Sequence, residues 1–186
     1  MTIDTCWGRR KIHEKPYWHL VSTQPSAGLT FYQNIRVYKG VMPTISALIK
    51  AEPHLENAQT HYSYAKINDE KEKLFEKVRQ DKYPALPSRL KTIYLFDDYA
   101  LVERALKDWF ENDPRNVHEC RILVGSNTHK ADTEWLNCHQ NEWEQCSHKY
   151  WNGIMSPNAF PEVIVDGVIY FPNYTSFPCP SSFLPK

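Results

Sequence analysis

Glycine is scarce in this sequence, and its scarcity excludes two common ways of binding nucleotides. The chain has six glycines in 186 residues, and none of them forms the glycine-rich loop with which P-loop and dinucleotide-binding folds hold phosphate groups. A nucleotide bound here would need a fold without such loops.

Long apolar runs are also missing: none approaches the roughly 20 residues of a membrane-spanning helix, and residues 1–20 lack the apolar core of a signal peptide. We therefore expect a cytoplasmic chain with no membrane partner.

Net charge is absent as well. The 22 Lys and Arg residues balance the 22 Asp and Glu residues, so the chain has no overall basic field of the kind that attracts nucleic acid, although a local patch or a single-strand groove stays open. The five cysteines are an odd number without the spacing of a disulfide framework. This usage fits a reducing compartment.

The order of apolar patterns predicts the fold class. A chain of this length fits one domain, 1–186, with a basic leader (1–16) and an irregular tail (173–186). We predict a long loop with a short helix over 126–160, and an α+β fold with a mostly antiparallel sheet. The elements expected between leader and tail are strands at 16–22, 31–40, 90–98 and 117–125, helices within 45–82 and at 99–113, and a β-hairpin at 161–172 that turns at Asp166-Gly167.

Two of the predicted helices have defined inward faces. The helix that follows an Asn/Asp start near residue 68 directs Leu74, Phe75 and Val78 to one side. The helix at 99–113 is expected to bury its apolar face, which comprises Leu101, Ala105, Leu106 and Trp109.

Metal and thiol chemistry have weak signals. Cys138, His139, Cys146 and His148 offer four zinc-type donors, but neighbouring positions point different ways and the paired spacings of structural zinc sites are missing. Buried thiols in a polar loop are the favoured interpretation, and a zinc-stabilised interaction module is an alternative. No cysteine occupies a recognisable nucleophile position.

Three polar residues on predicted strands carry the functional signal: His19 in "YWHLVS", Tyr94 in "TIYLFDD" and Glu162 in "PEVIVDGVIYF". Taken singly, each has an ordinary structural explanation. Their order resembles the His-Tyr-Glu branch of the ADP-ribosyltransferase superfamily, which includes diphtheria-type toxins and poly-ADP-ribose polymerases. That branch has a His ending its first strand, a Tyr on a later strand that leads into a helix, and a Glu opening a strand near the C-terminus. The resemblance covers motifs between about residues 17 and 171.

This resemblance implies a split, mostly antiparallel β-sheet with flanking helices, and an enzyme that cleaves NAD at the nicotinamide–ribose bond. Glu162 would stabilise the oxocarbenium-like ribose. His19 would position the dinucleotide and Tyr94 would stack on nicotinamide. Leu20 would lie beside the nicotinamide carboxamide, and Tyr99 would replace a second stacking tyrosine that the family has in its helix.

The resemblance also implies a partner. ADP-ribose would pass to a macromolecular acceptor, either protein or nucleic acid, as in toxins, effectors and phage-defence enzymes, and an antitoxin or inhibitor protein would be a further partner. Phe160 stands where arginine-directed members often have a carboxylate, which disfavours arginine as acceptor. The aromatic residues of 126–160 are candidates for acceptor recognition or cleft closure; they are Trp135, Trp143, Tyr150 and Trp151.

Two alternatives remain open on the same fold. Water as acceptor would make the chain an NAD glycohydrolase. Leu20, where the family usually has Gly, favours a degenerate binding domain without catalysis, whereas the intact His-Tyr-Glu order favours catalysis.

Overall fold

The chain folds into two compact units whose segments alternate along the sequence. The computed structural model describes residues 1–5, 8–23 and 25–177, and for residues 25–30 and 61 it describes the backbone alone. Among the described residues, the first unit comprises Met1–Met42, Phe96–Val124 and residues 168–177. The second comprises Pro43–Leu95 and Gly125–Gly167. The length alone predicted one domain, whereas the contacts divide the chain into these two units.

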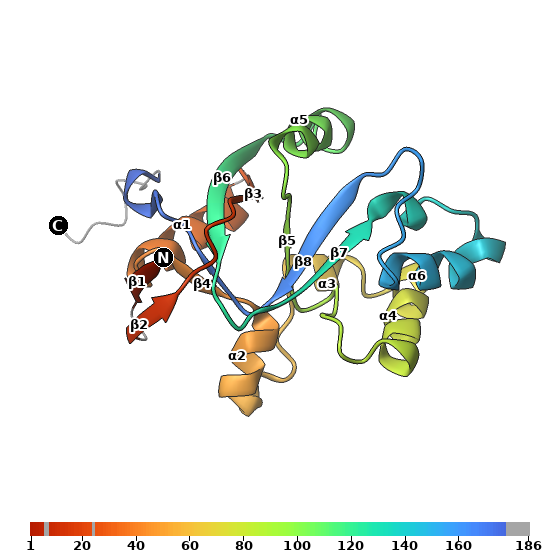
Figure 1. The fold of residues 1–186 in the computed structure, drawn as a ribbon, viewed down its shortest axis with the longest axis horizontal. Helices are drawn as coiled ribbons and strands as arrows, with labels where there is room; N and C mark the ends of the chain where they lie inside the picture. The colour runs from red at the N-terminus through yellow and green to blue at the C-terminus, as the bar shows by residue number, and fades with distance from the viewer. Residues whose placement is uncertain (6–7, 24, 178–186) are drawn as a thin grey trace. The chain divides into compact units, whose positions relative to one another are not determined.

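The first unit contains a two-stranded and a four-stranded sheet (Figure 1). The strands β1 (Thr2–Thr5) and β2 (Gly8–Lys11) pair antiparallel, so the predicted leader has regular structure. The larger sheet has the order β3-β6-β9-β4, and its strands are β3 (Tyr17–Ser22), β6 (Arg115–Ile122), β9 (Val168–Tyr170) and β4 (Val41–Pro43). The helices of this unit are α1 (Pro25–Val37), α5 (Tyr99–Asp108) and the short 3-10 helix η4 (Tyr174–Ser176).

The strand predicted at 31–40 is wrong, because this segment belongs largely to helix α1. The aromatic and β-branched residues of "FYQNIRVY" favour a strand locally. Tyr32 and Ile35 are both buried, and a spacing of three places them on one face of a helix. Burial of this face overrides the local preference.

Helix α5 is confirmed, but its inward face is shifted by part of a turn. Asp98 caps its N-terminus, since the Asp98 side chain accepts a hydrogen bond from the backbone N–H of Ala100 at 3.0 Å. Val102 and Ala105 are the buried residues of this helix, whereas Trp109, which we expected to point inward, is 44% exposed.

The second unit is a three-stranded antiparallel sheet with helices packed against it (Figure 1). Its order is β5-β8-β7, and its strands are β5 (Ile93–Leu95), β8 (Pro161–Asp166) and β7 (Asn127–Asp132). The helical segments of this unit are α2 (Ile45–Ala51), η1 (Pro53–Leu55), α3 (His61–Ala65), α4 (Glu70–Lys82), η2 (Thr133–Leu136), η3 (Gln140–Glu142) and α6 (Trp143–Trp151).

Helix α4 forms as its sequence predicts. Asp69 caps its N-terminus by accepting a hydrogen bond from the backbone N–H of Glu72 at 3.1 Å. Phe75 and Val78 are buried, and Leu74 packs beside them. They form one apolar cluster with side chains from α6, β7 and β8, and these are Ala131, Cys146, Tyr150, Trp151 and Ile164.

The predicted hairpin at 161–172 is wrong. Only Gly167 separates β8 from β9, yet the two strands belong to different sheets. Gly167 has φ of 157°, and a Cβ at this position would lie 2.3 Å from Ser126 Oγ. The Asp166 carboxylate accepts a hydrogen bond from Lys50 Nζ at 2.6 Å. The Asp-Gly pair therefore serves a crossing between sheets rather than a two-residue turn.

Residues 126–160 are more regular than the long loop that we predicted. They form β7, two 3-10 helices and α6, in which Tyr150 and Trp151 are 0% and 2% exposed. For these two residues the packing explanation is right. Trp135 Nε1 donates to Ile154 O at 2.6 Å, while Trp143 begins α6 and is partly buried.

The fold class is thus α+β, with antiparallel sheets and flanking helices. Within the described residues, no helix is long and apolar enough to span a membrane.

Candidate functional site

Glu162 lies at the start of β8, within the second unit, and its side chain is enclosed. Strand β5 pairs antiparallel with β8 so that Tyr94 stands opposite Ile164. Because side chains alternate along a strand, Glu162, Ile164 and Tyr94 share one face of the sheet. This is the face on which α4 and α6 pack, since Ile164 belongs to the apolar cluster with both helices. Glu162 is consequently 5% exposed.

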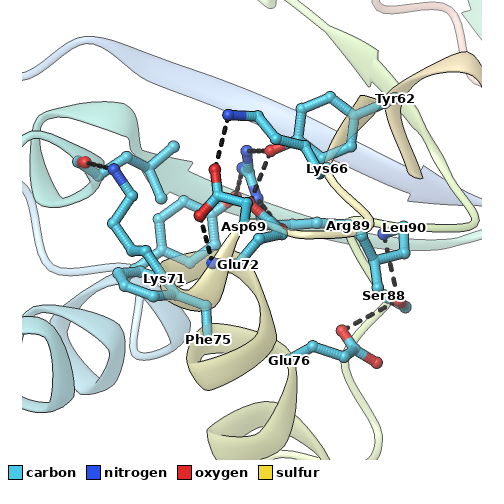
Figure 2. A network of polar contacts seen from close by, with 12 residues as sticks. Tyr62, Lys66, Asp69, Lys71, Glu72, Phe75, Glu76, Ser88, Arg89 and Leu90 are labelled. Carbon is cyan, nitrogen blue, oxygen red and sulfur yellow. Dashed lines mark hydrogen bonds and ion pairs between the residues drawn. The ribbon is translucent and has the colours of Figure 1, made fainter. Parts of the chain in front are cut away.

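Arg89 is the partner that makes this burial tolerable. It comes from the segment between α4 and β5 and is 3% exposed. Its Nη1 donates to Glu162 Oε1, and its Nε donates to Glu72 Oε1 at 3.1 Å. Glu72 lies in the first turn of α4 and is 4% exposed. One buried cation therefore bridges two buried carboxylates, and Figure 2 shows the Glu72 side of this bridge.

Two tyrosines complete the bridge in a matched way. Tyr62 accepts from Arg89 Nη2 at 2.8 Å and donates to Glu72 Oε2 at 2.7 Å. Tyr150 accepts from Arg89 Nη1 at 2.6 Å and donates to Glu162 Oε1 at 2.7 Å. Each hydroxyl thus lies between the guanidinium and one carboxylate. We call these five residues, Tyr62, Glu72, Arg89, Tyr150 and Glu162, the Arg89 cluster.

Tyr94 borders the Arg89 cluster. Its hydroxyl donates to the backbone carbonyl of Arg89, and the Arg89 guanidinium lies 5.2 Å from the centre of its ring. The Tyr62 ring meets it edge-on, with 5.1 Å between the centroids. Glu162 and Tyr94, two of the three residues singled out from the sequence, are therefore brought together around a cation that the sequence analysis did not consider.

The two carboxylates differ in how their oxygens are used. Both oxygens of Glu72 accept a hydrogen bond, one from Arg89 and one from Tyr62. In Glu162, by contrast, Oε1 accepts from both Arg89 and Tyr150, and no described residue donates to Oε2. The enclosed polar atoms that lack a partner in the described part of the chain are Asp113 Oδ1, Arg115 Nε and Ser156 Oγ. Because Glu162 Oε2 is not among them, it holds part of the 7% of this side chain that stays exposed.

The electrostatics of the Arg89 cluster keep its donors protonated. Burial alone lowers the pKa of Arg89, but the negative charge of Glu162 and the neighbouring groups raise that pKa well above its usual value. Burial, opposed by the Arg89 charge, raises the pKa of the Tyr62, Tyr94 and Tyr150 hydroxyls above the ordinary tyrosine value. The three hydroxyls therefore remain hydrogen-bond donors across the physiological pH range.

His19 and Leu20 lie in the first unit, on β3. His19 stands opposite His118 of β6, and its ring centroid lies 6.0 Å from that of Phe31 and 6.2 Å from that of Phe171. Leu20 stands opposite Val117 and points to the other face of the sheet. His19 is thus part of an aromatic cluster on one face of the four-stranded sheet.

Tyr99 opens α5 in the first unit and is 48% exposed. Its ring meets Trp18 edge-on, with 5.7 Å between the centroids. Both rings line a cavity of about 360 Å³, whose other lining residues are Val117, His118, Glu119, Asn173, Ser176 and Phe177. An exposed aromatic ring at a cavity is suited to stacking on a planar ligand.

The cysteine and histidine donors do not form a metal centre in the part of the chain that the structure describes, where no three His, Cys, Asp or Glu side chains are grouped as a metal requires. Cys146 lies in the apolar cluster, and burial raises the pKa of its thiol to about 12. Cys138 donates to Trp135 O at 3.3 Å. His148 Nδ1 lies 2.9 Å from the Tyr83 hydroxyl.

Comparison with known families assigns the chain to one family. The family model described as "Protein of unknown function (DUF2441)" matches residues 15–174. The chain belongs to this family. No curated protein matches the chain. The DUF2441 match contains the whole Arg89 cluster together with His19, Tyr94 and Tyr99. All of these candidate site residues therefore lie in the part of the chain that defines the family.

Three residues of the Arg89 cluster, Tyr62, Glu72 and Arg89, were not predicted from the sequence of this DUF2441 chain. Arg89 ends the "PALPSR" segment, which lies between a predicted helix and a predicted strand and carried no functional prediction. Glu72 has the appearance of an ordinary charged residue in a helix first turn. Tyr62 was unmarked among eleven tyrosines, and Tyr150 was predicted to recognise the acceptor or close the cleft rather than to contact Glu162. The one signal available was the position of Arg89, which follows two prolines, Pro84 and Pro87, and directly precedes a predicted strand.

Proposed function

We propose that this chain is an ADP-ribosyltransferase that cleaves NAD and passes ADP-ribose to a macromolecular acceptor. In this reaction the bond between nicotinamide and ribose C1′ breaks, and its electron pair leaves with the nicotinamide nitrogen. The ribose acquires oxocarbenium-like positive charge. A nucleophile of the acceptor then bonds to C1′ and loses its proton.

One observation carries the proposal: Glu162 presents a single open carboxylate oxygen beside Tyr94 on a nearly enclosed sheet face. A fixed negative charge in a site that excludes water stabilises a developing cation more strongly than the same charge in water. Oε2 would accept from the ribose 2′-hydroxyl and offset the positive charge. The order His19, Tyr94, Glu162, which resembles that of the ADP-ribosyltransferase superfamily, supports the same reaction.

The other residues take supporting parts in the proposal. Tyr94 would contact the departing nicotinamide ring, and His19 would donate to a ribose hydroxyl on the adenosine side. Leu20 and Tyr99 are proposed as further NAD-contacting residues, and the exposed ring of Tyr99 is suited to stacking. We propose an ADP-ribosyltransferase-like fold on the same grounds, and a role as a toxin, effector or phage-defence enzyme with a protein inhibitor as partner.

The test uses purified chain, NAD labelled in its adenylate part, and a mixed lysate that is fractionated afterwards into protein, RNA and DNA. We expect label in one macromolecular fraction, which would also identify the acceptor class. Label found only in free ADP-ribose would show that the chain hydrolyses NAD, as a glycohydrolase does, and does not transfer ADP-ribose. No release of nicotinamide under any condition would refute the proposal.

Two matched variants locate the reaction in the chain. Glu162→Gln removes the carboxylate with the open oxygen, and a loss of about 10²–10³ in rate is expected for removing a transition-state electrostatic contact. Glu72→Gln removes the other carboxylate of the same cation, with similar burial, and should leave the rate unchanged once the protein is folded. Circular dichroism and urea unfolding of both proteins check the fold. Equal rates in the two variants would remove Glu162 from the mechanism.

A second candidate function is a binding domain without catalysis. The ion pair between Glu162 and Arg89 favours it, because a carboxylate already neutralised by a buried cation has less charge to offer a substrate. Leu20 after His19 favours it too. Calorimetry that detects NAD binding, combined with an absence of nicotinamide release, would establish this candidate instead.

A further inference from the structure

The two halves of the Arg89 cluster are alike in composition and unlike in completeness. Each half has one carboxylate, one tyrosine hydroxyl and one side of the Arg89 guanidinium. In the Glu72 half, every carboxylate oxygen has a donor. In the Glu162 half, two donors converge on Oε1, and Oε2 has none among the described residues.

Buried carboxylates are stable only when hydrogen bonds satisfy their oxygens, since the loss of hydration costs several kcal/mol per ion. In the Glu72 half, protein donors alone meet this condition, whereas Oε2 of Glu162 lies at the exposed part of its side chain, where solvent or a substrate can reach it. Among the carboxylate oxygens of the Arg89 cluster, Glu162 Oε2 is therefore the one to which no described residue donates a hydrogen bond.

The formal charges of the Arg89 cluster are unbalanced in the same direction. One guanidinium faces two carboxylates, which leaves a formal charge of −1 among groups that are 3–5% exposed. In Glu72 each carboxylate oxygen accepts from a different donor, whereas in Glu162 both donors bind the same oxygen, Oε1. The surplus negative charge is thus presented at Oε2, where a positively charged group would balance it.

We infer that Arg89 and Tyr150 are positioning residues for Glu162. Together they hold Oε1, fix the rotation of the carboxylate, and leave Oε2 as the one oxygen that meets the substrate. Tyr62 and Glu72 supply the opposite, structural half, which anchors the guanidinium. This inference rests on the proposed function and adds to it the contacts that fix the orientation of the Glu162 carboxylate.

Holding a carboxylate in one rotamer matters because a reacting contact depends on sub-ångström geometry. Displacing such a group by about 1 Å can cost on the order of 10²-fold in rate. A contact that acts only as charge develops on the ribose changes kcat and leaves KM unaffected. Loss of the contacts that orient the Glu162 carboxylate should therefore lower kcat.

The experiment compares Tyr150→Phe with Tyr62→Phe in the full chain. Each variant deletes one hydroxyl that accepts from Arg89 and donates to a glutamate, at distances that agree within 0.2 Å (2.6 and 2.7 Å against 2.8 and 2.7 Å). Both side chains keep their rings, so both proteins should fold, with similar shifts of the urea midpoint. Release of nicotinamide from NAD supplies kcat and KM.

We expect Tyr150→Phe to lower kcat by about 10- to 100-fold at unchanged KM, and Tyr62→Phe to retain the kcat of the unaltered chain. Equal kcat in the two variants, whether high or low, would overturn the inference while leaving the proposed function standing. An unaltered chain that releases no nicotinamide would refute the proposed function, and the inference with it.

Discussion

Replacing Arg89 by methionine should destabilise the second unit far more than the loss of an ordinary ion pair would. Arg89→Met keeps a long apolar side chain and removes the cation from between Glu72 and Glu162. Hydrogen bonds to charged groups are worth about 1.5–3 kcal/mol each, and two of them reach a carboxylate here. The variant no longer has to desolvate a guanidinium, which offsets part of this loss. We expect the free energy of unfolding to fall by about 3–5 kcal/mol, as for a buried pair that loses one partner.

The control is Lys50→Met. Lys50 Nζ lies 2.6 Å from Asp166 Oδ2, but the Lys50 side chain is 68% exposed, so its loss should cost about 0–1 kcal/mol. Both values come from urea unfolding followed by tryptophan fluorescence. Trp151 is a suitable reporter because it is 2% exposed and its Nε1 donates to Phe75 O at 2.8 Å.

A double variant tests the electrostatic origin of the effect. In an Arg89→Met background the carboxylate of Glu162 has lost its cation, so Glu162→Gln should cost less there than in the unaltered chain. A coupling energy of about 1–3 kcal/mol is expected for groups in direct contact. Strictly additive effects, or an Arg89→Met variant as stable as Lys50→Met, would refute the reasoning.

Two further predictions concern a glycine and a pair of histidines. Gly167→Ala should lower the free energy of unfolding by about 1–3 kcal/mol through backbone strain and the contact with Ser126. Gly125 also has a positive φ, of 96°, but a Cβ there meets nothing within 4 Å, so Gly125→Ala should cost less by the contact with Ser126 when both variants are compared by thermal unfolding; the opposite ranking would contradict this account. Burial, with the charge of His19, lowers the pKa of His118 from 6.5 to about 4, so the unfolded chain binds more protons than the folded chain between these values. Stability should therefore fall as pH drops from 6.5 to about 4, and His118→Gln should flatten this dependence; His129, whose pKa is also lowered by burial, should contribute in the same direction. An unchanged pH dependence in His118→Gln would show that His118 is not buried as a neutral group.

Sequence patterns predicted the elements whose stability is local. Helix α4 was predicted because Asp69 caps it and Phe75 and Val78 repeat at helical spacing. Strands β3 and β6 were predicted from runs of aromatic and β-branched residues. In these elements the local preference and the buried face agree.

The failures have a common physical cause, since each depends on a partner far away in the sequence. Asp166-Gly167 has the composition of a tight turn, but Asp166 pairs with Lys50 and Gly167 N donates to Thr44 Oγ1, more than 110 residues earlier. Residues 31–37 favour a strand locally and form a helix because Tyr32 and Ile35 are buried.

The candidate site was predictable only in part. The order of Tyr94 and Glu162 led to two residues that the structure places on one sheet face. Arg89 could not be found in this way, because no periodicity marks a residue in a short segment before a strand. Its significance lies in contacts with Glu72 and Glu162, which are 17 and 73 positions away.

The division of the second unit into two chain segments has a kinetic consequence. Tyr62, Glu72 and Arg89 belong to Pro43–Leu95, whereas Tyr150 and Glu162 belong to Gly125–Gly167. The contacts among these three residues lie within one segment, whereas the contacts of Arg89 with Tyr150 and Glu162 require a closure that spans the intervening 96–124 segment. Contacts of such long sequence separation form slowly, because the entropy of loop closure must be overcome before they stabilise the chain. We therefore expect the Glu72 half of the Arg89 cluster to form before the Glu162 half, which is completed only after Gly125–Gly167 has been synthesised.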